Sequence, residues 1–234
     1  AGSGYRLYAV DVDDGVFGTS ASFDINSGPA AALRFDTQPG SGIAGGALGV
    51  QPRVSVVDAM GNRVASSTDS ISLQVTTGTG AVGAAITCTT NPLAAVAGSA
   101  TFAGCAVDLA SGGYTLTPSS GTLTSAVSTP FDVTTGTGSH LAFLTNPGGG
   151  PAGMPFATQP VVAVTDAGGN GVGGLVTLSI KPGTGAPGAT LTCAATTVAA
   201  SAGAASFTGC AIDRVSPTPY VLQATLGSVT ADSS

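Results

Sequence analysis

The chain has few charged residues and contains neither glutamate nor tryptophan. Charged residues make up 8% of the 234, and Lys181 and His140 are the only residues of their kinds. Most helix surfaces are built from Glu, Lys, Gln and Arg, so this composition disfavours helices. The chain instead offers Val, Thr, Ile, Phe and Tyr in short runs between clusters of Gly, Pro, Asn and Asp, which predicts an all-β sandwich or barrel.

Basic clusters and long apolar runs are also absent. The formal net charge is −6, and no group of Lys and Arg could neutralise phosphates, so we expect no nucleic-acid partner. No apolar run approaches the roughly 20 residues of a membrane helix, so we expect no membrane insertion. The chain begins with neither an initiator Met nor a signal peptide, which indicates a mature product or a part of something longer.

What the chain does contain is an internal repeat. The segment from Cys88 to Cys105 returns as the segment from Cys193 to Cys210. Each copy has sixteen residues between its cysteines, a Phe three positions before the second cysteine and an Asp three positions after it. A repeat of this length predicts two domains of one architecture. Matched cysteine pairs without metal-ligand spacing predict one disulfide in each copy and an oxidising compartment.

Further matches at offsets of 105 to 109 residues set the domain boundaries. We divide the chain into a hairpin over 1–29, a domain over 30–136 and a domain over 137–234. The first segment repeats the end of the first domain, so we expect it to be the closing hairpin of a preceding or neighbouring domain, with Asp14-Gly15 as its two-residue turn. The second domain stops before the counterpart of the strand at Phe131-Asp132-Val133, so we expect it to lack its last strand.

Two local patterns refine the fold. The alternation of apolar residues changes phase just before Cys105, and a bulge at Ala103-Gly104 would keep both phases in the interior. Tyr114 and Tyr220 begin the penultimate strands, where a tyrosine can form the corner hydrogen bond typical of immunoglobulin-like sandwiches.

Taken in order, these landmarks resemble the bacterial immunoglobulin-like repeats found in tandem in large secreted and cell-surface proteins. The resemblance covers nearly the whole chain. Its residues are the entry segments Leu33-Arg34-Phe35 and Leu141-Ala142-Phe143, the turns Val57-Asp58-Ala59 with Gly61-Asn62 and Thr165-Asp166-Ala167 with Gly169-Asn170, the strands Ala100-Thr101-Phe102 and Ala205-Ser206-Phe207, and the exit from Tyr114 to Val133. The resemblance implies tandem immunoglobulin-like Greek-key β-sandwiches of about seven strands each, with an extra N-terminal β-hairpin, used as a spacer, adhesin stalk or fibre module. It implies no shared catalytic residues, and many such repeats lack the cysteine pair.

No pattern predicts an enzyme. His140 lies between the repeats without a neighbouring nucleophile, so we interpret it as a solvated linker residue. Asp11, Asp13 and Asp14 resemble part of a calcium loop but lack the third alternating Asp and the downstream Glu. We interpret them as an acidic hairpin tip, with a calcium site as the alternative, and we expect no cofactor. Lys181 could form a cross-link to Asn or Asp, but its counterpart in the first copy is a threonine.

The expected function is structural, outside the cell or on its surface, as a rod, stalk or filament of stacked domains. A ligand-binding adhesin region and an accessory module of a secreted polysaccharide-degrading enzyme are the alternatives. The expected partner is either a second copy joined head to tail or the continuation of a longer repeat array. The candidate residues for strand donation between copies are Thr19, Ser20, Ala21, Ser22, Phe23, Asp24 and Ile25.

Overall fold

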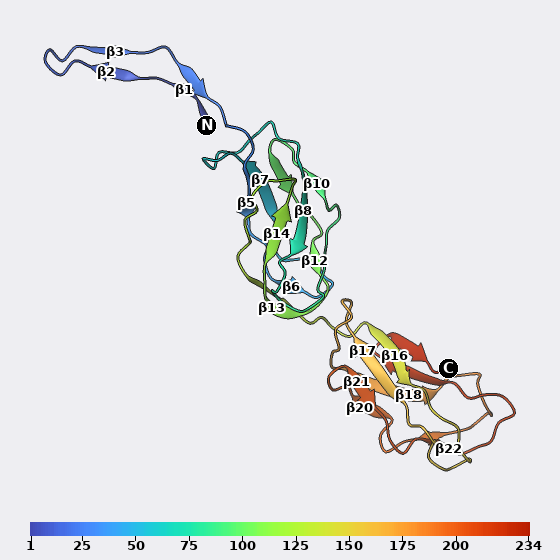
Figure 1. Ribbon diagram of the computed structural model, residues 1–234. Helices are drawn as coiled ribbons and strands as arrows, with labels where there is room; N and C mark the ends of the chain where they lie inside the picture. Colours follow the sequence, from blue (N-terminus) through green and yellow to red (C-terminus); the bar gives the residue numbers. More distant parts are fainter.

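The computed structural model describes residues 1–234 and consists of β-strands joined by turns and loops. A thin hairpin is followed by two β-sandwiches in series (Figure 1). The N-terminus lies where the hairpin meets the first sandwich, and the C-terminus lies at the side of the second sandwich. The prediction of an all-β, immunoglobulin-like sandwich fold is confirmed. The structure contains no helix that could span a membrane.

The first sandwich is built from eleven strands. They are β5 (Ala32–Thr37), β6 (Gly42–Ile43), β7 (Arg53–Val57), β8 (Ser70–Val75), β9 (Ile86–Thr87), β10 (Leu93–Ala94), β11 (Ser99–Thr101), β12 (Ala106–Val107), β13 (Ser111–Tyr114), β14 (Leu116–Ser119) and β15 (Phe131–Thr134). One sheet has the order β11-β7-β5 and a second has the order β10-β8-β14. Strand β15 lies between β13 and β6, and β12 pairs with β9.

The second sandwich repeats most of this plan with nine strands. They are β16 (His140–Thr145), β17 (Val161–Thr165), β18 (Leu175–Ile180), β19 (Leu191–Thr192), β20 (Thr197–Ala199), β21 (Ala204–Ser206), β22 (Ala211–Ile212), β23 (Leu222–Leu226) and β24 (Val229–Asp232). The sheet β16-β17-β21 corresponds to β5-β7-β11, and β20-β18-β23-β24 corresponds to β10-β8-β14 with one more strand. No sheet corresponds to β13-β15-β6.

Each core lies between its two main sheets. Successive side chains of a strand point to opposite faces, so Leu33 and Phe35 of β5 point inward with Ile71 and Leu73 of β8. The first core has 18 buried residues and the second has 11. The second sandwich therefore has less apolar packing to stabilise it.

Both predicted disulfides are confirmed: Cys88 is bonded to Cys105, and Cys193 to Cys210. The first bond links the short strands β9 and β12, and the second links β19 and β22. The bulge predicted at Ala103-Gly104 is wrong in form. Strand β11 ends at Thr101 and β12 begins at Ala106 in a different sheet, so four residues separate two strands. The interior placement of both phases is nevertheless observed, and Gly104 has the positive φ of 61° that the break requires.

The tyrosine corner is present in both sandwiches. The hydroxyl of Tyr114 donates to the carbonyl of Leu109 at 2.8 Å, and that of Tyr220 donates to the carbonyl of Arg214 at 2.9 Å. Each bond fixes the chain where it enters the penultimate strand.

The N-terminal hairpin consists of β1 (Gly2–Tyr5), β2 (Tyr8–Val10), β3 (Phe17–Thr19) and β4 (Phe23–Ile25). Strand β2 pairs with β3, and β1 pairs with β4. The predicted two-residue turn at Asp14-Gly15 is wrong, because the Asp11 N–H donates to the Val16 carbonyl and closes a four-residue loop over 12–15. The Asp11 carboxylate accepts a bond from the Asp13 N–H at 2.9 Å and holds this longer turn.

Candidate functional site: the joint and an open strand position

The linker between the two sandwiches is held by the carboxylate of Asp166. This carboxylate is 1% exposed and lies in the turn after β17. Its Oδ2 accepts a hydrogen bond from the linker N–H of Gly136 at 2.8 Å, and its Oδ1 accepts bonds from the N–H groups of Gly168 and Asn170. One side chain thus fixes both its own turn and the chain that enters the domain.

Asn170 connects the two sandwiches directly. Its Nδ2 donates to the Asp108 carbonyl at 3.0 Å, and its Oδ1 accepts from the Ala110 N–H at 2.9 Å. The domains also approach closely here, since a Cβ atom on Gly168 would lie 2.0 Å from the Asp108 carbonyl oxygen. The joint therefore needs an amide at position 170 and a glycine at position 168.

The same contacts recur where the N-terminal hairpin meets the first sandwich. The Gly28 N–H donates to Asp58 Oδ2 at 2.8 Å, and the Ala1 nitrogen donates to Asn62 Oδ1 at 2.5 Å. Ala1 is the counterpart of Ala110, so the bonds to the aspartate Oδ2 and to the asparagine Oδ1 recur. The amide nitrogen of Asn62 donates only to Asp58, so the bond from Asn170 to the Asp108 carbonyl has no counterpart. A further difference is that Met60, which is 84% exposed, stands where the second joint has its glycine.

These hydrogen bonds favour the ionised form of both carboxylates. The Gly28 N–H, together with the other donors of the loop, lowers the pKa of Asp58 from 3.8 to about 2. Burial works against ionisation of Asp166, but the N–H of Gly136 and the other donors outweigh it and lower its pKa. Both carboxylates are therefore charged acceptors over the physiological pH range.

The second structural feature is the position of β15 at the end of the first sandwich. Strand β15 pairs in parallel with β6 and antiparallel with β13. The Ala44 N–H donates to the Thr134 carbonyl at 2.8 Å, and the Gly113 N–H donates to Asp132 Oδ1 at 2.8 Å. Phe131 and Val133 are 4% and 3% exposed. This strand closes the core beneath Tyr114.

In the second sandwich the same position is a groove of about 570 Å³. It lies between 147–152 and 214–220, the counterparts of the segments that flank β15. The matching hydrogen bonds around it support this equivalence: Gly153 N–H donates to the Ile212 carbonyl as Gly45 N–H donates to the Val107 carbonyl. The N–H of Ala152, counterpart of Ala44, donates no hydrogen bond.

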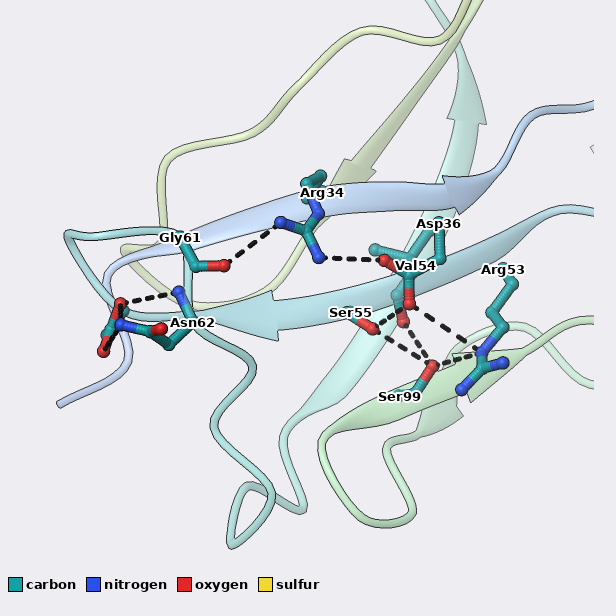
Figure 2. Close-up of polar contacts among 9 residues, drawn as sticks. Arg34, Asp36, Arg53, Val54, Ser55, Gly61, Asn62 and Ser99 are labelled. Carbon is teal, nitrogen blue, oxygen red and sulfur yellow. Dashed lines mark hydrogen bonds and ion pairs between the residues drawn. The ribbon is translucent and has the colours of Figure 1, made fainter. Parts of the chain in front are cut away.

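A polar row covers the outer face of one sheet of the first sandwich (Figure 2). Arg34 Nη2 lies 3.3 Å from Asp36 Oδ1, Ser55 donates to the other oxygen of Asp36, and Arg53 Nε donates to Ser99 Oγ at 2.7 Å. The row contains no histidine, and the Asp36 carboxylate that accepts from Ser55 also lies near Arg34 and Arg53. The counterparts in the second sandwich are Ala142, Leu144, Val161, Ala163 and Ala204.

The candidates from the sequence are placed as follows. Of the strand-donation residues, Thr19 ends β3, Ser20 to Ser22 form a connection, and Phe23–Ile25 is strand β4. The structure does not gather Asp11, Asp13 and Asp14 into a metal-binding cluster. His140 is the exposed first residue of β16 and not a linker residue, with its Nδ1 2.9 Å from Ser139 Oγ.

Lys181 forms an ion pair, with Nζ 2.5 Å from Asp232 Oδ2. Both side chains are more than one-third exposed, and this pair joins the strand β24 to the end of β18. The pair is a surface contact and contributes little to stability.

Sequence reasoning missed the role of Asn62 and Asn170 at the joints. Their repetition marked them as turn residues. Their position four residues after a repeated aspartate was the one signal in the sequence for a role at the joint. A hydrogen bond between domains depends on how the domains are placed, which the repeat alone does not specify.

No protein-family model and no curated protein matches this chain. Among solved structures, surface layer protein SbsC, domains 4-9, has a TM-score of 0.31 at 21% identity over 94% of this chain. A Parabacteroides merdae beta-glucuronidase has a TM-score of 0.27 at 13% identity, covering 88% of this chain and 25% of its own. A chimeric titin Z1Z2 tandem has a TM-score of 0.25 at 16% identity, covering 86% of this chain and 95% of its own. This chain spans 33% of the surface-layer structure. Similarities at this level carry no argument about function.

Proposed function

We propose that the chain is a structural repeat protein of the bacterial immunoglobulin-like type, in which stacked sandwiches form a rod or filament outside the cell. The observation that carries this proposal is the repeated joint. Asp58 and Asp166 each accept a bond from an N–H of the chain that enters the domain, and Asn62 and Asn170 each accept one bond through Oδ1 from the preceding unit. A joint that recurs with its hydrogen bonds keeps each unit at a set orientation to the next.

The disulfides fit the same function. A covalent bond across two short strands restricts the unfolded chain by about 3 kcal/mol for a loop of this length. Disulfides persist in oxidising compartments, which favours an extracellular or cell-surface location. The rod continues either through further repeats of the same chain or by head-to-tail contact between copies.

The groove in the second sandwich does not favour a catalytic or ligand-binding alternative. Its place in the fold is that of a strand, and Arg214 is its only charged lining residue. A hydrolytic site would need a pair of carboxylates or a nucleophile with its base. We therefore interpret the groove as a surface that takes part in the stacking of units.

Small-angle X-ray scattering at low protein concentration tests the rod. The Phe23→Asp chain is used because Phe23 lies in the candidate strand-donation segment, and this change keeps the chain from donating that strand to a second copy. The proposal predicts an elongated particle whose maximum dimension matches the row of sandwiches, and a wider spread of dimensions when Asn170→Ala removes both bonds between the domains. Asn146→Ala, which changes an amide outside the joint, is the control. Equal flexibility of all three proteins would contradict the proposal.

A further inference from the structure

Resting on the proposed function, we propose that the groove of the second sandwich binds strand Phe23–Ile25 from a second copy of this chain. The contact joins the start of one molecule to the far end of another. Because its two surfaces are different, the contact is heterologous, and its repetition extends an open filament wherever the rotation does not close a ring.

The groove has the properties of an unfilled strand position. Tyr114 is fully buried beneath β15, whereas its counterpart Tyr220 is partly exposed. Ala44 is buried and bonded to β15, whereas Ala152 is exposed and its N–H donates no hydrogen bond. The Tyr220 N–H also has no acceptor. A strand in the groove would bury both residues and supply the missing acceptors.

The N-terminal hairpin carries a strand of the matching form. Phe23-Asp24-Ile25 corresponds to Phe131-Asp132-Val133, and the local geometry is the same. The Gly4 N–H donates to Asp24 Oδ1 at 2.8 Å, as the Gly113 N–H does to Asp132. The ring centroids of Tyr5 and Phe23 are 6.2 Å apart, and those of Tyr114 and Phe131 are 5.9 Å apart.

The apolar side chains of this strand are uncovered within the chain. Phe23 is 39% exposed and Ile25 is 50% exposed, while their counterparts in β15 are 4% and 3% exposed. The groove lining includes Phe156, Ile212 and Leu222. Packing of both side chains against these residues is favourable because it removes apolar surface from water.

Charge is complementary at the polar position of the strand. The residue before Tyr220 is Pro219, which lacks the N–H that Gly113 uses to bind Asp132. Arg214 lines the groove and donates one hydrogen bond, to the Pro187 carbonyl at 3.3 Å. We infer that the Asp24 carboxylate pairs with this guanidinium instead of with the main chain.

The exchange needs only the residues after Ser20. Ser20 Oγ accepts from the Leu7 N–H as Ser233 Oγ accepts from the Leu222 N–H, both at 2.9 Å. Residues up to Ser20 therefore duplicate strands that the acceptor already has, and we expect them to stay outside the groove. Strand β4 separates from β1 and enters the groove.

Sedimentation of the 234-residue chain over a range of concentrations tests the proposal. We expect assembly that grows with concentration and is lost in Phe23→Asp. Phe17→Asp is the matched control, since Phe17 is 67% exposed on the same hairpin but outside the donated strand, and its assembly should equal that of the unchanged chain. Equal loss in both variants would show unspecific association and overturn the proposal.

A fluorescent peptide of residues 19–27 tests the groove separately, with the Phe23→Asp chain as acceptor. We expect binding that weakens about tenfold to a hundredfold when the peptide carries Phe23→Ala. No binding would overturn the strand site. Binding by the peptide together with a monomeric unchanged chain would overturn the second copy as the donor. Neither result changes the scattering test of the rod, which uses a chain that cannot donate its strand.

Discussion

The two sandwiches share their internal fixtures and differ at their surfaces. Both have the disulfide, the tyrosine corner and the aspartate that ties the linker. Only the first has β15 and the polar row of Figure 2, and only the second has the open groove. The comparison indicates that the repeat fixes how a unit folds, and that the surfaces outside these fixtures are free to change.

Loss of the β15 anchor should give the largest effect. Phe131→Ala removes a side chain that is 4% exposed and should lower the free energy of unfolding of the first sandwich by about 3–5 kcal/mol. The variant would make the first sandwich resemble the second. Hydrogen exchange measured for each domain in the full chain checks this. A loss below about 1 kcal/mol would show that the strand does not stabilise the core.

Removal of the disulfides should rank next. Replacing Cys88 and Cys105 by Ala, or Cys193 and Cys210 by Ala, opens loops of the same sequence separation, 17. Each double replacement should therefore cost about 3 kcal/mol. When each sandwich has lost its own disulfide, the second should unfold at the lower temperature because it has the smaller core. Calorimetry of the two variants measures both melting temperatures. A lower melting temperature for the first sandwich would contradict this order.

The polar row should give a smaller effect that is confined to the first sandwich. Asp36→Ala removes the acceptor of the Ser55 hydroxyl, which is buried, and should cost about 1–3 kcal/mol. The matched change in the second sandwich is Leu144→Ala, at a residue that is 64% exposed, and it should stay within about 0.5 kcal/mol. Urea unfolding of the two variants gives the comparison. Equal losses would show that the row is not a stabilising network.

Acid should have the mildest effect. The pKa of Asp58 is lowered from 3.8 to about 2 in the folded chain. A carboxylate with a lowered folded-state pKa contributes stability above its unfolded value and loses that contribution as the pH falls through the folded value. The hold on the linker should be unchanged from pH 7 to about 5 and should weaken between about 4 and 2. Asp58→Asn should remove this pH dependence at the first joint, as followed by the exchange rate of the Gly28 amide. A loss already complete at pH 5 would contradict the account.

The sequence predicted the features that depend on spacing along the chain. The cysteines, the tyrosines before Leu116 and Leu222, and the relation of Phe23 to Phe131 are all repeated in order, so pattern matching finds them. The turn at Asp14-Gly15 was wrong because the Asp11 side chain competes with the backbone for the local hydrogen bonds.

Other features could not be predicted because they depend on tertiary placement. Asn170 bonds to residues about 60 positions away in another domain. Ser55 and Ser99 become a network only once β7 and β11 pair. The groove of the second sandwich follows from a missing strand. The prolines that line its edge come from two segments far apart in the sequence, so their proximity depends on the folded strands.

The central claim is that Asp166 and Asn170 hold the two sandwiches at one orientation. Residual dipolar couplings of backbone amides in the Phe23→Asp chain at low concentration, which does not donate its strand, measure this most directly. The account predicts that both sandwiches fit one alignment tensor, and that the additional change Asn170→Ala separates the fit into two tensors of different magnitude. Two different tensors before that change would contradict the account.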